Sequence, residues 1–569
     1  MNIHSSSDQP CEGPSGRGSF LFSIVFFWLY AVTLLFTGLG VRELWTAEDR
    51  WAEVARMMLL TGDYFHPTIN GQPYFDKPLL GYWVIVGVAR LLGGLNEWAV
   101  RIPSAIAGLI ALGATISLGR KLWSREAALM AGWLLLTCHG FLFWARTGQA
   151  DMGNLAAIIL AINWYWGRRN RPTFFSAAVF YIICFAGAQM KGLAAVAVPF
   201  LAVGADLLRE KRWRFVFTFR HLAALLAGLA VYVAPFVIES WTRGHYSSSG
   251  LALVFRENIQ RYFNPFDHKG AFYIYLYDLP LLFLPWAPLF LLALPAGLPR
   301  LKKLDASSRW LVTAAALAFL FFSASGSRRS YYILPLLPFC SLLTARWLAG
   351  NVSPALKKIG FQIIAGVFAL MALVEIVSWP IWPLVNAHLG IALPRDLLPA
   401  SFAIGALALF VGIMYRFYPT PYSRLMGFRS PLAPLIMMAM LLLGGFFCRQ
   451  QLSLEAFRTV RTFGRIAREL KPSAKQVAFY NRTSAALAFY MNYPEPIAVL
   501  TNTADIVRFL EDSKNKNALI VSQRDFIKLA QEMPGEAQLR ILLAEPVPPG
   551  QEKDFKEMLL VDYPAVQGD

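Results

Sequence analysis

The sequence predicts a polytopic α-helical membrane protein with about thirteen transmembrane helices and a small α/β domain at its C-terminal end. The composition is the first observation: 56% of the 569 residues are hydrophobic and 15% are charged, whereas globular domains carry about 25% charged residues. Length is the second, because single hydrophobic cores stop growing near about 250–300 residues. The third is the recurrence of long apolar stretches over residues 20–447. Together these observations exclude a soluble enzyme, a disordered protein and a disulfide scaffold.

The net charge of +18, from 53 Lys and Arg against 35 Asp and Glu, does not indicate nucleic-acid binding. The basic residues lie between apolar runs and form no groove-sized patch. In a membrane protein such residues mark the loops on the cytoplasmic side. The cysteines contain no closely spaced pair, so neither a metal site nor a disulfide framework is indicated; they are Cys11, Cys138, Cys184, Cys340 and Cys448.

The basic loops decide which apolar stretches cross the membrane. The candidate stretches are 20–40, 79–93, 102–118, 126–142, 153–167, 173–190, 193–208, 222–240, 275–297, 310–324, 331–349, 359–379, 400–417 and 431–447. If all crossed, basic loops 119–125 and 167–172 would lie outside, against the positive-inside rule. Omitting 79–93, which contains Arg90 and ends in Gly93-Gly94, places every later basic loop inside. About thirteen spans remain, with a cytoplasmic N-terminus.

This topology divides the chain into three parts. Residues 1–19 are a cytoplasmic tail, residues 20–448 form the transmembrane domain, and residues 449–569 form an external α/β domain. The external domain is predicted because short β-like runs alternate with helical patterns at 503–510 and 524–531. The expected strands are 476–480, 497–500, 517–521 and 540–543. Residues 41–101 form the first external loop, with juxtamembrane helices.

The first external loop carries two adjacent carboxylates at the start of an amphipathic helix. Glu48 and Asp49 lie in the expected first turn, where acidic residues favour the helix dipole. Apolar residues recur at helical spacing up to Gly62, as in a helix lying on a membrane surface. The two acids are therefore either capping carboxylates or catalytic groups.

An acid and a lysine lie on the same outer side. Asp151 is at the outer end of a span, where a carboxylate is costly unless it is paired or functional. It either pairs with Arg146 or takes part in chemistry. Lys191 interrupts two apolar runs, and it either snorkels to the interface or binds an anion.

Two cationic clusters complete the outer face. Residues 261–270 include His268, and residues 325–335 include Arg328, Arg329, Tyr331 and Tyr332. Such residues are either headgroup anchors or ligands of an anionic substrate. Acids and cations that converge on one membrane face suit an anionic, lipid-linked substrate.

The order of these motifs resembles bacterial lipid-linked sugar transferases of the GT-C fold. The motifs are Glu48-Asp49-Arg50-Trp51-Ala52-Glu53, Thr61-Gly62-Asp63, Tyr74-Phe75-Asp76-Lys77-Pro78-Leu79 and the later Asp151. The aminoarabinose transferases that modify lipid A are the nearest resemblance, and the protein O-mannosyltransferases are more distant. The resemblance covers residues 41–350.

The resemblance implies roles for individual residues. The family's Asp-Glu-x-Arg motif aligns with Ala47-Glu48-Asp49-Arg50, so Ala47 replaces the leading Asp, which is the usual catalytic candidate. Either Glu48 or Asp49 supplies the carboxylate here, or this protein uses the site differently. Asp151 matches the second acidic position. The remaining expected residues bind the substrate or the donor phosphate; they are Arg50, Tyr74, Lys77, Lys191, His268, Arg328, Tyr331 and Tyr332.

The resemblance also implies an inverting sugar transfer from a polyprenyl-phosphate donor to a lipid A or glycolipid acceptor, on the periplasmic face of the bacterial inner membrane. A protein O-glycosyltransferase with the same type of donor is an alternative. A lipid flippase or transporter is another, although no internal repeat is present. No cofactor is indicated, no nucleotide motif is found, and a divalent metal is left open.

Overall fold

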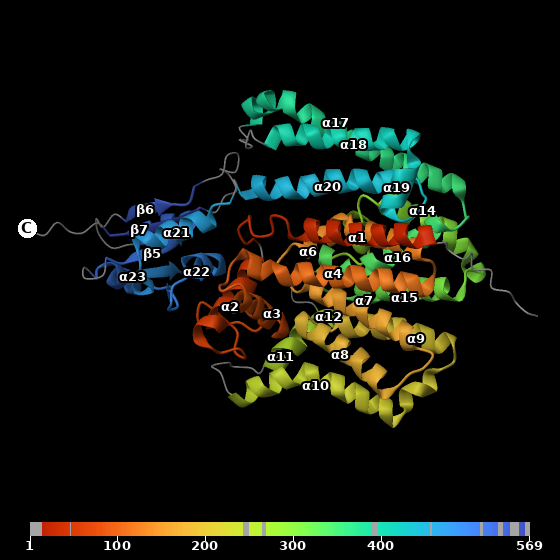
Figure 1. Cartoon of the computed structure of the whole chain (residues 1–569). Coiled ribbons are helices and arrows are strands. Elements are labelled where there is room, and N and C mark those ends of the chain that lie inside the picture. Colours follow the sequence, from red (N-terminus) through yellow and green to blue (C-terminus); the bar gives the residue numbers. More distant parts are fainter. Residues whose placement is uncertain are drawn as a thin grey trace, which may run out of the picture.

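The computed structural model describes residues 14–45, 47–242, 250–264, 269–389, 397–455, 458–512, 516–532, 539–546 and 557–563. Most of these residues form a bundle of helices that lie side by side, and a small sheet-containing module lies beyond one end of the bundle (Figure 1). The bundle helices are α1 (Pro14–Phe36), α4 (Glu97–Leu122), α5 (Arg125–Leu136), α6 (His139–Ala145), α7 (Asp151–Arg168), α8 (Phe174–Met190), α9 (Ala194–Arg209), α10 (Phe219–Thr242), α13 (Tyr275–Leu282), α14 (Ala287–Gly297), α15 (Ala306–Ala324), α16 (Leu337–Ala349), α17 (Pro354–Leu389), α18 (Leu397–Phe417) and α20 (Leu432–Glu455). Shorter helical segments join them: η1 (Trp213–Phe217), α11 (Gly250–Phe255), η2 (Arg256–Gln260), α12 (Arg261–Phe263), η3 (Leu298–Lys303), η4 (Ser330–Leu336) and α19 (Pro419–Met426).

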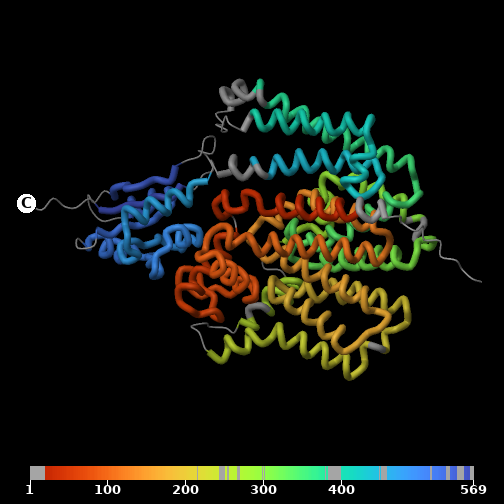
Figure 2. The backbone as a smooth tube through the Cα atoms, in the orientation of Figure 1, coloured from red at the N-terminus to blue at the C-terminus, as the bar shows by residue number. Residues whose placement is uncertain are grey.

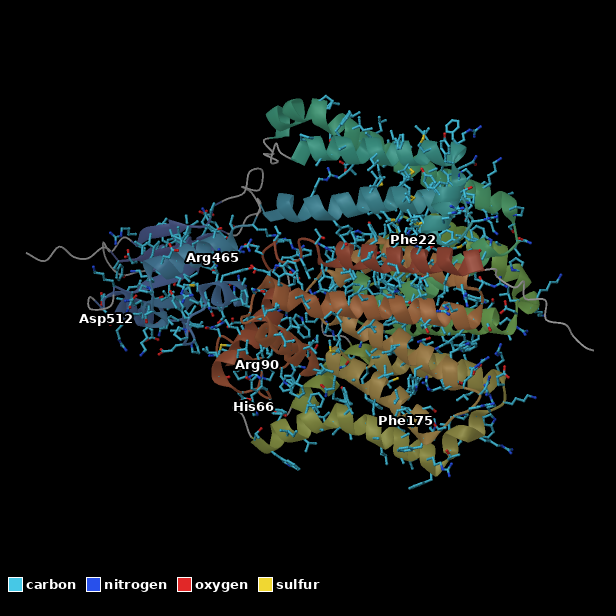
Figure 3. The ribbon with its side chains drawn as sticks, viewed as in Figure 1. Phe22, His66, Arg90, Phe175, Arg465 and Asp512 are labelled. Atoms are coloured by element: carbon cyan, nitrogen blue, oxygen red, sulfur yellow. The ribbon has the colours of Figure 1, made fainter. Side chains whose placement is uncertain are left out.

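The bundle is that of a helical membrane protein. Among the described residues, six helices are long and apolar enough to cross a membrane, and the bent pair α5 and α6 makes a seventh if it is one span. Exposed apolar side chains such as Phe22 and Phe175 lie on the flanks of the bundle, whereas Arg465 lies on the module (Figure 3). An apolar surface of this kind is stable against lipid.

Fewer helices satisfy these criteria than the thirteen predicted spans, because several predicted spans are short or broken. The 126–142 span is divided between α5 and α6, which are bent by 67°. The 275–297 span is divided between α13 and α14, and Pro285 lies in the interruption. A proline cannot supply an interior helix hydrogen bond. The count of thirteen remains a prediction.

The first loop forms the helices expected of it. Helix α2 (Glu48–Thr61) ends at Gly62, which adopts the left-handed conformation with φ 73°, as a helix C-terminus favours. A two-stranded hairpin of β1 (Thr68–Ile69) and β2 (Gln72–Pro73) follows. Helix α3 (Leu80–Leu91) has 12 residues and is about 18 Å long, too short for a hydrocarbon core of about 30 Å.

The module at the end of the bundle contains a five-stranded mixed sheet with strand order β4-β3-β5-β7-β6. Its strands are β3 (Val477–Tyr480), β4 (Ala498–Leu500), β5 (Ala518–Ser522), β6 (Arg540–Ala544) and β7 (Met558–Asp562). Its helices are α21 (Val460–Leu470), η5 (Ala474–Gln476), α22 (Ala485–Met491), α23 (Thr503–Leu510) and α24 (Gln523–Glu532). The first four strands coincide with the expected runs to within a residue, and β7 was not predicted.

Alternating side chains explain why helices cover both faces of the sheet. Phe479 and Ile520 pack with Phe463 of α21 and Leu487 of α22. Their neighbours along the strands point to the other face, where they pack with α23 and α24; these neighbours are Ala478, Leu519 and Val521.

The module lies against the first loop, although the two are far apart in sequence. Figure 2 shows the early segment with α2 and α3 beside the late segment of the module. The Tyr490 hydroxyl accepts a hydrogen bond from the backbone N–H of Leu44 at 2.7 Å and donates one to Glu97 at 3.2 Å. Arg461 pairs with Glu97 at 2.9 Å. The first loop and the tail thus share one end of the bundle, as the predicted topology requires.

A second set of polar contacts joins the same two segments. The side chain of Asn70 donates to the carbonyl of Ile497 and accepts from its N–H, both at 2.7 Å. Arg56 binds Glu53 with two nitrogens, at 2.7 and 2.8 Å, and donates to the carbonyl of Tyr493 at 2.8 Å. Because all these groups are buried, their hydrogen bonds specify one position of the module on α2.

Candidate active site

A cavity of about 170 Å³ opens at the end of the bundle that carries the first loop. Three cations and two carboxylates line it: Lys77, Lys191, Arg261, Asp151 and Glu257. The rest of the wall is mainly aromatic and apolar, with Leu193, Ala194, Tyr262, Tyr275, Phe321, Phe322, Tyr331, Tyr332, Leu334 and Pro335. A polar part rich in cations beside an apolar part suits a phosphate attached to a hydrocarbon chain.

Asp151 and Lys191 form an ion pair within this cavity. Asp151 is the first residue of α7, and Lys191 ends α8. The Lys191 ammonium also lies 5.0 Å from the ring centre of Tyr331 and 4.8 Å from that of Tyr332, within cation–π distance. Burial lowers the pKa of Lys191, but Asp151 and the two tyrosines outweigh this effect and raise it above 10.5. These partners therefore favour the charged form of Lys191.

Lys77 and Arg261 lie on the two sides of Glu257. Lys77 Nζ is 4.0 Å from Glu257 Oε2, and Arg261 Nη1 is 2.8 Å from the same oxygen. Arg261 also donates to the Ser327 hydroxyl at 3.2 Å. Burial lowers the pKa of Lys77. One carboxylate thus lies between two cations in the cavity wall.

Two asparagines shape the loop that presents Lys191. Asn154 donates to the carbonyls of Gly187 and Gly192, at 3.1 and 3.0 Å. Asn258 accepts a hydrogen bond from the N–H of Leu193 at 3.1 Å. A side chain at Gly192 would collide with the Asn258 amide and would displace it from the N–H of Leu193. The turn is held from α7 and from η2 together.

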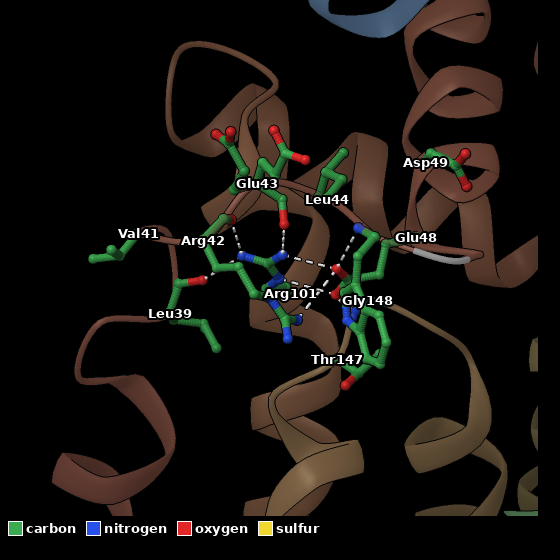
Figure 4. Close-up of polar contacts among 12 residues, drawn as sticks. Leu39, Val41, Arg42, Glu43, Leu44, Glu48, Asp49, Arg101, Thr147 and Gly148 are labelled. Carbon is green, nitrogen blue, oxygen red and sulfur yellow. Dashed lines mark hydrogen bonds and ion pairs between the residues drawn. The ribbon is translucent and has the colours of Figure 1, made fainter. Parts of the chain in front are cut away.

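Glu48 lies in a saturated, fully buried network rather than in the cavity wall (Figure 4). Arg101 binds its carboxylate with two nitrogens, at 2.9 and 2.7 Å. The N–H groups of Gly148 and Trp45 donate to it at 2.5 and 3.3 Å. Burial raises the pKa of Glu48, but the attraction of Arg101 and the other donors leave it below 4.5. The arrangement stabilises a charged Glu48 and occupies its oxygens.

Asp49 points away from that network (Figure 4). It lies at one end of a polar chain that runs through Arg50 and Tyr74 to Asp76. Arg50 lies in electrostatic contact with Asp49 and donates to the Tyr74 hydroxyl at 2.9 Å. Tyr74 in turn donates to Asp76 at 2.7 Å, next to Lys77. Burial raises the pKa of Asp49 above 3.8, which makes it a better proton acceptor than an ordinary aspartate.

The structure therefore brings together many of the residues expected from sequence. Lys77, Asp151, Lys191, Tyr331 and Tyr332 line one cavity. Asp49, Arg50 and Tyr74 connect to it through the polar chain just described.

Two other expected ligands are not placed in the cavity wall. Arg328 donates to the carbonyls of Gly270 and Ser323 and does not line the cavity; it joins two loops. His268 lies outside the described residues.

Sequence reasoning missed the residues that complete the site. Arg261 begins the 261–270 cluster, from which only His268 was selected, and Glu257 lies just before that cluster. The i, i+4 spacing of these opposite charges was the available signal. Arg101 was missed because its partner Glu48 is 53 residues away. In the part of the chain that the structure describes, no group of three His, Cys, Asp or Glu side chains is placed to hold a metal.

A larger groove of about 860 Å³ lies between α2 and the module. Leu59, Leu60, Leu95 and Phe489 give it an apolar surface. Arg465 and Arg468, both exposed, face it from α21. Asn96, Asn492, Glu97 and Glu469 contribute polar groups.

Comparisons with known proteins agree with the resemblance stated from the sequence motifs. The family described as dolichyl-phosphate-mannose-protein mannosyltransferase matches residues 76–238. The undecaprenyl phosphate-alpha-4-amino-4-deoxy-L-arabinose arabinosyl transferases of Enterobacter sp. (strain 638) and Erwinia tasmaniensis are 29% and 28% identical to this chain. The Enterobacter match covers 66% of this chain and 68% of the relative. The Erwinia match covers 65% of this chain and 66% of the relative.

A solved structure decides the fold. ArnT from Cupriavidus metallidurans, bound to undecaprenyl phosphate, superposes with a TM-score of 0.73 at 20% identity, over 95% of this chain and 98% of that one. The chain is a GT-C-fold relative of the aminoarabinose transferases. The resemblance read from the motifs of the first loop and Asp151 is thereby confirmed.

Proposed function

We propose that this chain is an integral-membrane glycosyltransferase that moves a sugar from a polyprenyl-phosphate donor to a lipid A or other glycolipid acceptor. The observation that carries the proposal is the cavity in which Lys77, Lys191 and Arg261 meet an apolar wall. The names of the related arabinosyl transferases and the undecaprenyl phosphate bound to ArnT support this type of donor.

The reaction is a single displacement at the anomeric carbon, and it inverts the configuration of that carbon. An acceptor oxygen forms the new bond to that carbon, and the bond from the carbon to the donor phosphate breaks. The polyprenyl phosphate leaves with the electron pair, and Lys77, Lys191 and Arg261 stabilise its charge. Asp151 orients Lys191 for this role.

Asp49 is the candidate base. It takes the place of the Asp that the family carries at the position of Ala47. An acceptor hydroxyl would pass its proton to Asp49, whereas an acceptor phosphate is already an anion and has no proton to lose. Glu48, whose oxygens are occupied by Arg101 and two backbone N–H groups, is a positioning residue. It holds the start of α2 against α4.

The groove between α2 and the module supports a lipid acceptor. Among the described residues, no ion pair is found for Arg465 or Arg468, and both border an apolar surface. A phosphorylated glycolipid carries both kinds of group: anionic phosphates and acyl chains.

The charge distribution supports a periplasmic site. Asp151 begins α7, while the other end of that helix leads to Arg169, which pairs with the buried Asp206 at 2.9 Å. Arg209 and Arg212 surround the same carboxylate. Basic clusters mark the cytoplasmic side, so the cavity, the first loop and the C-terminal module lie on the periplasmic side of the inner membrane. The division into 1–19, 20–448 and 449–569 belongs to this proposal; α1 begins at Pro14 and α20 ends at Glu455, within a few residues of these boundaries.

A reconstitution experiment tests the function. The full chain in proteoliposomes receives polyprenyl phosphate with a radiolabelled sugar, together with lipid A or with periplasmic protein. Label in lipid A supports the proposal. Label found only in protein would show that the acceptor is a protein and not a lipid. Label found in neither acceptor would reject transferase activity with this donor.

A further inference from the structure

Tyr275 carries a buried hydroxyl that the site described so far does not use. It begins α13, its side chain is 1% exposed, and it lines the cavity with Lys191 and Arg261. The backbone N–H of Arg329 approaches its Oη atom, but the hydroxyl hydrogen has no acceptor among the described residues. A buried donor without an acceptor costs free energy.

Other unpartnered polar atoms lie near this tyrosine. Asp278 follows one turn later on the same helix, and its Oδ2 atom is buried without a partner. Arg328 is an electrostatic neighbour of Tyr275, and its Nε atom also lacks a partner. The Oγ atom of Ser323, the residue whose carbonyl Arg328 binds, is unpartnered too. Buried polar groups are nearly always paired in native proteins, but of these residues only Tyr275 lines the cavity, so its hydroxyl is the one that a ligand in the cavity can reach.

The surroundings of Tyr275 favour an anion over a neutral ligand. The cavity holds three cations but only two carboxylates. Both carboxylates are already engaged by cations, Asp151 by Lys191 and Glu257 by Arg261. A tyrosine hydroxyl is a hydrogen-bond donor, and it can complete the shell of a phosphate that the cations attract.

We propose that the Tyr275 hydroxyl donates a hydrogen bond to the phosphate of the lipid-linked donor in this cavity. This assignment rests on the proposed function, because it requires a polyprenyl phosphate as ligand. Tyr275 would be a binding residue whose hydrogen-bond acceptor is the substrate phosphate. This explains why its hydroxyl hydrogen has no acceptor among the described residues. Replacing it with phenylalanine should therefore weaken the ligand and leave the protein as stable as before, or more so.

The test compares Tyr275→Phe with Tyr422→Phe in the full chain. The buried Tyr422 hydroxyl already donates to the carbonyl of Val411 at 2.8 Å, and α19 does not line the cavity. Undecaprenyl monophosphate, which carries no sugar, is the probe, and its Kd and the ligand-free Tm are measured. Tyr275→Phe is expected to raise Kd about tenfold or more without lowering Tm. Tyr422→Phe is expected to lower Tm without changing Kd.

The outcomes separate this inference from the proposed function. Equal Kd values for wild type and Tyr275→Phe would overturn the inference while the function stands. An effect seen only with a sugar-bearing donor would overturn the assignment to the phosphate. Absence of binding to the wild-type chain would instead refute the proposed donor.

Discussion

Glu48 and Arg101 form a buried ion pair with two hydrogen bonds, which joins the first turn of α2 to the start of α4. Arg101 also donates to the carbonyls of Leu39, Arg42 and Glu43 at 2.7–2.9 Å. The pair thus ties together the end of the first span, the helix of the first loop and the next long helix. The catalytic candidate Asp49 is the neighbour of this pair, so its position depends on it.

Glu48→Gln is expected to destabilise the protein by about 3–5 kcal/mol, because Arg101 would lose its buried charge partner. The pKa of Glu48 is lowered, so the pair stabilises fully above pH 4.5 and its contribution is lost as the pH falls through the lower native pKa. Tm in detergent, measured against pH, checks this. Glu126→Gln, an exposed site on α5, is the control, and a wild-type Tm for Glu48→Gln would contradict the expectation.

Asp49→Asn is expected to reduce kcat by about 10²–10⁴-fold if the acceptor is a hydroxyl, as for loss of a general base. Burial raises the pKa of Asp49, so the wild-type rate should fall on the acid side at a pH above the ordinary 3.8 of aspartate. The measurement is the pH profile of kcat for both proteins. Parallel profiles would show that Asp49 is not the base.

Asp151→Asn and Lys191→Ala should each lower kcat/KM, and the double variant should lose less than the product of the two effects. Residues in direct contact are coupled by about 0.5–3 kcal/mol. A double-mutant cycle measures this coupling. The half-exposed pair Arg346 and Asp305 serves as the control cycle, in which additivity is expected. Additivity at Asp151 and Lys191 would mean that they do not act as a unit.

Arg465→Ala combined with Arg468→Ala should raise the KM for lipid A by about tenfold while the KM for the donor stays unchanged. The reason is the loss of two cations from the groove beside α2, which would otherwise bind anionic phosphates. Initial rates at varied acceptor and donor concentrations check it. Arg508→Ala, an exposed arginine of the same module outside the groove, is the matched control. An unchanged acceptor KM would remove the groove from the acceptor path.

Asn70→Ala should loosen α2 from the module, because the buried N–H and C=O of Ile497 lose their partner. Each unpaired buried group costs about 1–3 kcal/mol. Limited proteolysis of the detergent-solubilised chain is the measurement, with faster cleavage expected between residues 62 and 79. Gln531→Ala on the exposed side of α24 is the control. Equal cleavage rates would show that this contact does not hold the loop.

Local patterns carried much of the prediction. Helix α2 followed from apolar spacing and from Gly62, and four strands of the module followed from short β-branched and aliphatic runs. The motif around Lys77 singled out one residue that lines the cavity, although its role in binding a phosphate stays a prediction. These signals lie within a few residues of one another, so a single sequence contains them.

Contacts between distant segments could not be predicted in this way. Nothing near Glu48 shows that Arg101 will occupy its oxygens, and nothing near Arg328 shows that it will bind the carbonyls of Gly270 and Ser323 instead of a ligand. The same reason hid Glu257 and Arg261, whose importance depends on the approach of Lys77. The sequence gives the sign of each charged residue, but the packing of distant segments determines which partner it has.

The contacts between the first loop and the C-terminal module have a consequence for the synthesis of the protein. Leu44 leaves the ribosome early, yet its hydrogen-bond partner Tyr490 follows 446 residues later. Asn70 likewise waits for Ile497, 427 residues further on. The partners of Leu44 and Asn70 are therefore synthesised last, and a chain that stops before the module lacks the hydrogen bonds that hold the first loop.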